Sequence, residues 1–409
     1  LLSTHVTALQ SLRGIYYDVG DSDELQSGYF LTPFVDALNT AGISNSFELY
    51  EGTHLSKLYT RLAESLEYLS EVLVHSAEGP TEIGEGDVSG TWTTEGSPYY
   101  INGEITVPDS ATLIIEPGVE VIFTGHFKFN VKGRLLAIGT TTDSIRFTAE
   151  DHSEGWHGIR FISTPSTNDS SIFEYCILEY GKANSGDGLN NRSGGAMALI
   201  GTDKVRISQC LFQYNSCYHS SMEMSAGGAI LVTGSPLIEF SEFRNNSGRY
   251  GGALTIYYNG SDPLVRNNYI HHNSGHGTIN IGASAEPLLI NNIIVHNTTD
   301  NHGHIHFANS GGVAVFINNT IANNTCSGSG GGIFINHGLE PLFINNIIYG
   351  NTPKQVRLET SSGLDFYHCL IEGGKNDFSG QQFTGSFQNN IDADPLFVNS
   401  NGGDFHLAD

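Results

Sequence analysis

The chain has 409 residues, including 49 Gly, and its 43 acidic side chains outnumber 18 basic ones, which gives a formal net charge of −25. Phosphate backbones and anionic membrane surfaces repel a chain this acidic, which argues against nucleic-acid binding. No apolar stretch approaches the roughly 20 residues that span a bilayer, and five scattered cysteines do not form a disulfide framework.

Residues 1–78 alternate short apolar runs with helical patterns. Residues 14–19 and 44–52 predict strands, and residues 32–42 predict a helix between them. Leucines at three- and four-residue spacing predict a second helix over residues 55–75. The order strand, acidic loop, helix, strand, helix is an α/β pattern with two parallel strands.

A polar loop follows each of these two predicted strands. Asp23 lies in GDSD after the first strand, with Asp21 as the alternative acid, and His54 lies in YEGTHL after the second. The segments GIYYDVGDSDE and FELYEGTHLSKLYTRL resemble the C-terminal end of the putative-esterase family of α/β-hydrolases. The resemblance implies that Asp23 is the acid and His54 the general base of a hydrolase triad.

The serine nucleophile of such a triad is missing from this sequence. No G-x-S-x-G elbow occurs in the 409 residues, and in this family the serine precedes the acid and the histidine. We therefore expect residues 1–78 to be the C-terminal fragment of an esterase whose catalytic body lies upstream of Leu1. Asp23 and His54 are then a vestigial acid and base.

Residues 79–409 lose the helical periodicity. Residues 79–90 are rich in Gly and Glu and predict a linker, after which apolar residues alternate in short strands. A motif then recurs, and its copies close at Asn215, Asn246, Asn273, Asn297, Asn324 and Asn351. A period near 25 residues with strands and no helix predicts a β-solenoid over residues 91–409, which we expect to continue beyond the chain end.

The fourth place of each motif holds a small side chain. These residues are Cys210, Ser241, Asn268, Asn292, Asn319 and Asn346, and Cys176 and Cys369 fall at the same place. Small polar side chains repeated at one corner can form a ladder in which each amide binds the next turn. We therefore expect an asparagine ladder, with the cysteines as buried fillers and not as disulfide partners.

This region resembles the right-handed parallel β-helix (pectate-lyase-like) superfamily, through its repeats and through VPDSATLIIEPGVEVIF and NIDADPLFVNSNGGDFHLAD. The resemblance implies a mainly β, right-handed parallel β-helix, here preceded by a partial α/β-hydrolase segment. It also implies a secreted or cell-surface bacterial protein that associates with a polysaccharide or cell-surface glycan, without membrane insertion. The fold hosts lyases, hydrolases and inert fibres, so the function depends on particular side chains.

The candidate glycan-binding residues lie on one strand position of the repeat. If the alternate apolar residues point inward, His304 and His306 face outward, in line with Asn280 on the preceding turn. Tyr257 and Tyr258 lie nearby and are suited to stack on sugar rings. We expect this face to bind a glycan and, because no third ligand accompanies the two histidines, no metal.

Catalysis on the β-helix is the alternative. His276 stands in a G-H-G sequence like that of pectinolytic hydrolases of this fold, but no Asp-Asp pair accompanies it. Lyases of this fold use a basic residue and Ca²⁺ held by acids, for which Arg249 and Arg266 are the candidates, with Arg244 and Asp262 nearby. We expect no cofactor for a binding module and Ca²⁺ for a lyase.

Overall fold

The structure is a computed structural model. It describes residues 15–22, 27–43, 45–53, 61, 63–65 and 79–408, except 163, 166, 187, 218–224, 259, 309–311 and 338–339. The chain divides into two compact units, Leu1–Glu78 and Gly79–Asp409.

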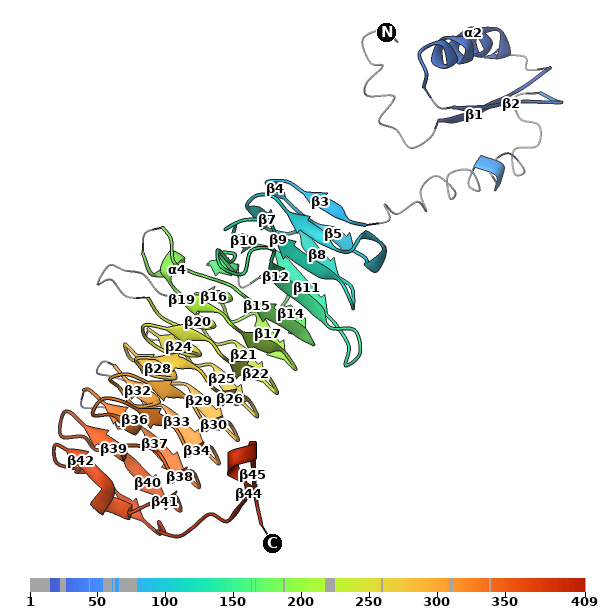
Figure 1. The fold of residues 1–409 in the computed structure, drawn as a ribbon. Coiled ribbons are helices and arrows are strands. Elements are labelled where there is room, and N and C mark those ends of the chain that lie inside the picture. The colour runs from blue at the N-terminus through green and yellow to red at the C-terminus, as the bar shows by residue number, and fades with distance from the viewer. Residues whose placement is uncertain are drawn as a thin grey trace. The chain divides into compact units, whose positions relative to one another are not determined.

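The described part of the N-terminal unit is a β-α-β segment (Figure 1). Strand β1 (Tyr16–Gly20) pairs in parallel with β2 (Ser46–Tyr50), and helix α2 (Ser27–Thr40) connects them. This arrangement agrees with the α/β pattern of the sequence. The helix begins at Ser27 and not at residue 32, and Pro33 lies inside it, where it forgoes one helical hydrogen bond.

Asp23 and His54 lie outside the described residues, as does segment 55–75 apart from residues 61 and 63–65. Asp21, the alternative acid, is exposed, and its carboxylate accepts a hydrogen bond from the backbone N–H of Gly52 at 3.0 Å. This bond joins the loops that follow β1 and β2.

The C-terminal unit winds into a parallel β-helix whose coils stack along one axis (Figure 1). The coils build three 12-stranded parallel sheets and a shorter fourth sheet. Sheet 1 comprises β4 (Gly86–Asp87), β7 (Ile105–Val107), β10 (Phe129–Val131), β13 (Ile159–Ile162), β16 (Met197–Ile200), β20 (Ile230–Thr233), β24 (Leu254–Tyr257), β28 (Ile279–Gly282), β32 (Ile305–Phe307), β36 (Gly331–Ile335), β39 (Lys354–Leu358) and β42 (Phe378–Gly380).

Sheets 2 and 3 follow sheet 1 around each coil. Sheet 2 comprises β5 (Gly90–Trp92), β8 (Thr112–Ile115), β11 (Arg134–Ile138), β14 (Ser171–Glu174), β17 (Val205–Ser208), β21 (Leu237–Glu239), β25 (Leu264–Arg266), β29 (Leu288–Ile290), β33 (Val315–Ile317), β37 (Leu342–Ile344), β40 (Asp365–Tyr367) and β43 (Phe387–Gln388). Sheet 3 comprises β3 (Thr81–Ile83), β6 (Tyr99–Ile101), β9 (Glu120–Phe123), β12 (Ile145–Ala149), β15 (Cys176–Glu179), β18 (Leu211–Gln213), β22 (Glu242–Arg244), β26 (Tyr269–His271), β30 (Ile293–Val295), β34 (Thr320–Ala322), β38 (Ile347–Tyr349) and β41 (Leu370–Ile371).

A fourth sheet lies between sheets 3 and 1 in the central coils. It comprises β19 (Ser216–Cys217), β23 (Ser247–Gly248), β27 (Ser274–Gly275), β31 (Thr298–Thr299) and β35 (Thr325–Cys326). The remaining elements are η1 (Thr94–Gly96), α4 (Leu189–Arg192), η2 (Gly374–Asp377), η3 (Ser400–Gly402) and the antiparallel pair β44 (Phe397–Asn399) and β45 (Asp404–Leu407).

Residues 79–90, expected to be a linker, instead contribute to the first coil. Strand β3 pairs with β6, and β4 pairs with β7. Glu82 and Glu85 are exposed, so their side chains remain in water while the backbone pairs with the next coil. An acidic, Gly-rich composition indicates solvation, and the outermost strands of a β-helix are solvated too.

The interior of the β-helix is filled by columns of identical or similar side chains. The apolar residues Ile256, Ile281, Phe307 and Ile335 of sheet 1 are buried in the core, as the alternation predicted. Phe343 stacks between Phe316 and Phe366, with ring centroids 4.6 and 4.9 Å away. Parallel, in-register coils place equivalent residues above one another, so each column buries apolar surface continuously.

Two buried amide ladders run along the corners. In the first, Asn268 Nδ2 donates to Asn292 Oδ1 at 2.9 Å, and the bonds to Asn319 and Asn346 repeat at 2.9 and 3.0 Å. The predicted asparagine ladder is therefore confirmed. The closing asparagines form a second ladder, with Nδ2 to Oδ1 distances of 2.9 to 3.0 Å from Asn215 to Asn351. All five cysteines are buried and unpaired.

Candidate functional site

The residues expected to form an exposed glycan-binding face are buried. His304, His306 and Asn280 are 0%, 1% and 2% exposed. The backbone just before each strand of sheet 1 folds over its outward side: a Cβ on Gly251 would meet Thr255 Oγ1 at 2.4 Å, and one on Gly277 would meet His306 Cβ at 3.1 Å. The expectation that these side chains are exposed is thus wrong, because alternation along a strand does not show what covers its outward side.

Burial also sets the charge of these imidazoles. It lowers the pKa of His304 to about 3, and burial followed by the nearby His302 and His276 lowers the pKa of His306 well below its ordinary value. Both side chains are therefore neutral near pH 7. Neither ring nitrogen of His306 has a hydrogen-bond partner.

Tyr257 and Tyr258 form a separate pair. Their rings lie 4.9 Å apart at 76°, and Tyr258 is 49% exposed. A Cβ on Gly282 would meet the Tyr257 ring at 2.6 Å, so this ring covers the next coil. Of the five candidate binding residues, Tyr258 is therefore the exposed one.

Other residues converge on a groove of about 200 Å³ beside the fourth sheet. The groove is lined by Ser247, Gly248, Arg249, Ser274, Gly275, His276 and Asp300. These residues come from three successive coils. His276 projects between Gly275 and Gly277, whose φ angles are +150° and +153°. A Cβ on Gly275 would come within 2.0 Å of the Gly248 carbonyl oxygen, so the coil spacing requires glycine there.

An imidazole–carboxylate pair lies in this groove. His276 Nδ1 is 2.5 Å from Asp300 Oδ1, and the two side chains are 25% and 59% exposed. Backbone bonds hold the pair in line: His276 N–H donates to Arg249 O at 3.0 Å and Asp300 N–H to Gly275 O at 3.2 Å. A carboxylate that accepts from Nδ1–H orients the ring and leaves Nε2 as the basic nitrogen.

A cation and aromatic rings surround this pair. The Arg249 guanidinium lies 5.8 Å from the Tyr250 ring centroid, and the Tyr250 ring lies 5.7 Å from that of His276. Two further imidazoles continue inward: His302 is 5.7 Å from His276 and stacks on His306 at 4.3 Å. We call His276, His302 and His306 the imidazole cluster. Burial, then the nearby His276, lowers the pKa of His302.

The sequence identified His276 and Arg249 separately, and the structure brings them together. Asp300 was missed, although a signal existed: it follows His276 by 24 residues, the spacing that separates the ladder residues Asn273 and Asn297. The other basic candidates lie outside the groove. Arg266 binds Glu239 at 2.6 Å on sheet 2, and Arg244 binds Glu242 at 3.1 Å on sheet 3.

The groove is a poor fit for the Ca²⁺ expected of a lyase. Ca²⁺ takes six to eight oxygen ligands, whereas Asp300 is the single carboxylate among the described lining residues. Across the described part of the chain, no three His, Cys, Asp or Glu side chains are arranged to hold a metal ion. None of the described helices is long and apolar enough to cross a membrane.

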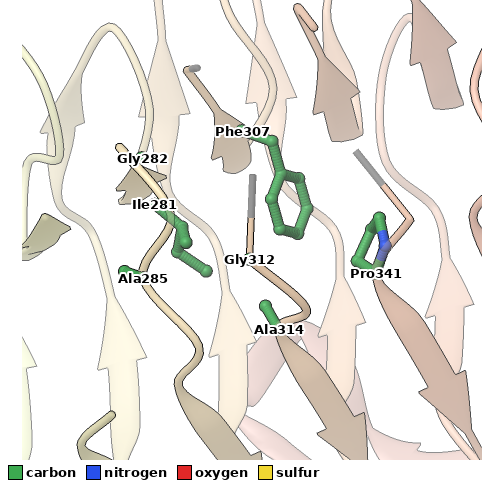
Figure 2. A pocket seen from close by; sticks show the side chains of 7 residues that line it. All are labelled: Ile281, Gly282, Ala285, Phe307, Gly312, Ala314 and Pro341. Carbon is green, nitrogen blue, oxygen red and sulfur yellow. The ribbon is translucent and has the colours of Figure 1, made fainter. Parts of the chain in front are cut away.

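A second hollow, shown in Figure 2, lies at the corner between sheets 1 and 2. It is lined by Ile281, Gly282, Ala285, Phe307, Gly312, Ala314 and Pro341. The Phe307 ring and the Ile281 side chain fill it so closely that no water molecule fits. Its described lining residues include no polar side chain, and it has no room for a water molecule, so it is not a candidate site.

Comparison with known proteins supports the fold of the central coils. Residues 152–321 match a family described as right handed beta helix region. No curated protein and no solved structure matches the chain. The matched residues include Arg249, His276 and Asp300, so the groove lies on a right-handed β-helix.

Proposed function

We propose that the β-helix is a carbohydrate-associated module and that a polysaccharide or cell-surface glycan binds in the groove beside the fourth sheet. The observation that carries this proposal is the convergence of Arg249, His276 and Asp300 from successive coils. Charged and hydroxyl side chains next to an aromatic ring suit sugars, which combine many hydroxyl groups with apolar C–H faces. A volume of about 200 Å³ is below the usual size of a pocket for a drug-sized ligand, and suits one ring of a longer chain.

The repeat favours a polymer over a free sugar. Ser247, Ser274, Thr298 and Thr325 occupy equivalent positions in paired strands of the fourth sheet. Successive hydroxyls are therefore about 4.8 Å apart along the axis. A glycan that lies along the axis would meet a similar hydroxyl at every coil.

Arg249 favours an acidic glycan. Its guanidinium brings positive charge to the groove of a chain whose formal net charge is −25. A guanidinium recognises a carboxylate through two parallel hydrogen bonds. We therefore expect polymers that contain uronate residues to bind more tightly than neutral ones.

A polysaccharide lyase is the second candidate, favoured by the 2.5 Å contact between His276 and Asp300. In this reading His276 Nε2 removes the proton on the carbon next to the uronate carboxylate, and the glycosidic oxygen leaves by β-elimination. Arg249 would hold that carboxylate and favour loss of the proton. An inverting hydrolase would need two carboxylates across the bond, and the described groove residues supply one.

The N-terminal unit adds a separate candidate, a carbohydrate esterase whose body lies upstream of Leu1. The bond from Gly52 N–H to Asp21, which joins the loops after β1 and β2, favours it. A secreted or cell-surface bacterial location would suit all three candidates. Joining the chain to its upstream coding sequence and assaying acetyl and feruloyl ester hydrolysis tests it, and a complete chain without activity would end it.

Binding is tested with uronate polymers and neutral glucans on the purified chain by calorimetry. Arg249→Gln should weaken uronate binding about tenfold, which corresponds to the loss of about 1.4 kcal/mol from a charged contact. Arg244→Gln, on sheet 3, is the matched control and should bind normally. Equal binding by both variants would overturn the site.

The two readings of the groove are separated by following the unsaturated product of β-elimination in the ultraviolet. A lyase should form product, and His276→Asn should stop it while binding remains. A binding module should hold the polymer without any product.

A further inference from the structure

The C-terminal hairpin folds back onto the outer side of sheet 3. Strands β44 and β45 pair in antiparallel fashion, and Figure 1 shows them beside the strands of the later coils. Phe405 is 6% exposed and forms a small apolar cluster with Val295 and Ala322. Tyr269, Ile293 and Phe397 pack against this cluster.

Histidines line one edge of this docked hairpin. A pocket of about 260 Å³ is lined by Tyr269, His271, His272, His296, Asn401, Gly402 and Gly403. His296 Nε2 is 2.8 Å from the Ser400 carbonyl oxygen and must donate to it. His271 Nε2 is 3.0 Å from Glu242 Oε1 and donates to that carboxylate. The hairpin is thus attached through apolar packing and through the imidazole of His296, while His271 and His272 line the pocket beside it.

The contact between His271 and His272 limits how many protons the pair can hold. Their Nδ1 atoms are 2.7 Å apart, so one must carry a proton and the other must accept it. One extra proton is tolerated, since either ring can be an imidazolium that donates to its neutral partner. A second extra proton places N–H groups on both Nδ1 atoms, and the contact becomes repulsive.

We propose that this pair is an acid-operated latch, and that protonation of both His271 and His272 releases the hairpin β44–β45 from sheet 3. Release uncovers the apolar side chains of Tyr269, Ile293 and Val295. The latch does not depend on what the groove binds.

The surrounding charges decide which proton breaks the contact. Glu242 accepts from His271 and from Arg244, and so supports the first positive charge. The titratable and charged groups around the pair are Glu242, Arg244, Tyr269 and His296, all from sheet 3. The hairpin residues that line the same pocket, Asn401, Gly402 and Gly403, carry no charge. Asp404 is already engaged by His406, with Oδ1 2.6 Å from Nδ1. The second charge, on His272, therefore lacks a counterion among these groups.

The direction of the pH dependence follows from His272. Partial burial, then His271 and His296, lower the pKa of His272 in the docked state. The released state consequently binds more protons at acidic pH. Docking is complete above the ordinary histidine pKa of about 6.5 and weakens as pH falls below it.

Hydrogen exchange of the whole chain at pH 7.5 and 5.0, corrected for the intrinsic exchange rates, tests the latch. Protection of residues 396–408 should fall at least tenfold at pH 5.0, while the buried coils keep theirs; release can change by up to tenfold per pH unit for each extra proton bound. Unchanged protection would overturn the proposal.

Variants and a titration sharpen this test. His272→Asn should remove the acid response, because the amide side chain does not take up a proton. The variant should keep the fold, because asparagine holds the equivalent left-handed positions Asn245 and Asn323. His368→Asn, an exposed histidine in the same left-handed conformation (φ +56°) after β40, is the control and should respond like the natural chain. Independently of variant folding, the NMR titration of His272 must share its midpoint with the loss of protection. Separate midpoints, or a full response in His272→Asn, would refute the latch.

Discussion

The same coils carry two kinds of buried polar column, the asparagine ladders and the imidazole cluster, which differ in whether their polar atoms have hydrogen-bond partners. In the asparagine ladders each amide donates to the next amide and to a backbone carbonyl, as Asn297 does to Asn324 and Ile270. In the imidazole cluster the side chains differ from coil to coil, and His306 has no hydrogen-bond partner at either nitrogen. In the ladders, repetition of the same amide gives each side chain its hydrogen-bond partners. In the imidazole cluster, the change of side chain from coil to coil leaves some ring nitrogens without a partner and gives the groove its individual chemistry.

The strongest way to break the comparison is to interrupt a ladder. Asn297→Leu preserves the volume but leaves the backbone N–H of Asn273, which donates to Asn297 Oδ1 at 2.9 Å, without its acceptor, and the Ile270 carbonyl without its side-chain donor. Each orphaned buried group costs about 1–3 kcal/mol, so we expect a loss of about 3 kcal/mol in the free energy of unfolding by urea. Thr298→Ala, exposed in the same coil, should stay within about 0.5 kcal/mol. Equal effects would refute the role of the ladder.

Acid should lower the free energy of unfolding through the buried, neutral imidazoles. The depressed pKa of His304, about 3, means that the unfolded chain binds a proton below about pH 6.5 while the folded chain does not. Stability is therefore full above pH 6.5 and falls toward pH 3, by about 1.4 kcal/mol per pH unit for each such histidine. Urea unfolding at pH 7.5, 6.5, 5.5 and 4.5 measures this slope. A flat profile would contradict the burial of neutral imidazoles.

Replacing an unmet imidazole should cost little. His306→Phe replaces an imidazole whose two nitrogens have no partner with an apolar ring. Phenylalanine already occupies the paired position on the next coil, at Phe334. We expect unfolding free energy to stay level or to rise by up to about 1 kcal/mol, with a shallower acid slope. His306→Ala is the comparison and should lose about 2–3 kcal/mol through the cavity it leaves. A loss as large for phenylalanine would mean that His306 is hydrogen-bonded after all.

The smallest effect should come from amides that repeat outside the core. Asn345 Nδ2 donates to Asn318 Oδ1 at 2.7 Å, but both side chains are exposed. Asn318→Gly keeps the φ angle of +57° available and should change the unfolding free energy by no more than about 0.5 kcal/mol. A larger loss would show that amide repetition stabilises the coils even in water.

Repetition also explains what could be predicted. The positions of Asn268, Asn292, Asn319 and Asn346 recur in the sequence, so the ladder, the inward apolar columns and the buried cysteines followed from alignment alone. The β-helix itself needed no more than the period and the absence of helical patterns.

The site was harder because its residues do not recur. His304 and His306 alternate like exposed residues, but the backbone that folds over sheet 1 buries them, together with the rings of His302 and Phe334 that pack on His306. Asp300 joins His276 because they stand one coil apart, a relation that a search for contiguous motifs overlooks. The docking of β45 on β30 joins segments about a hundred residues apart, with His296 bound to Ser400, and no local pattern encodes it.

The ladders keep their register although coil length changes. The bonded amides are separated by 24 residues between Asn268 and Asn292, by 27 between Asn292 and Asn319, and by 31 between Asn215 and Asn246. The extra residues of the longer coils must therefore lie in surface loops, while the stacked strands and ladders keep the same spacing. A longer loop in one coil can therefore introduce new binding residues without changing the stacked coils that support it.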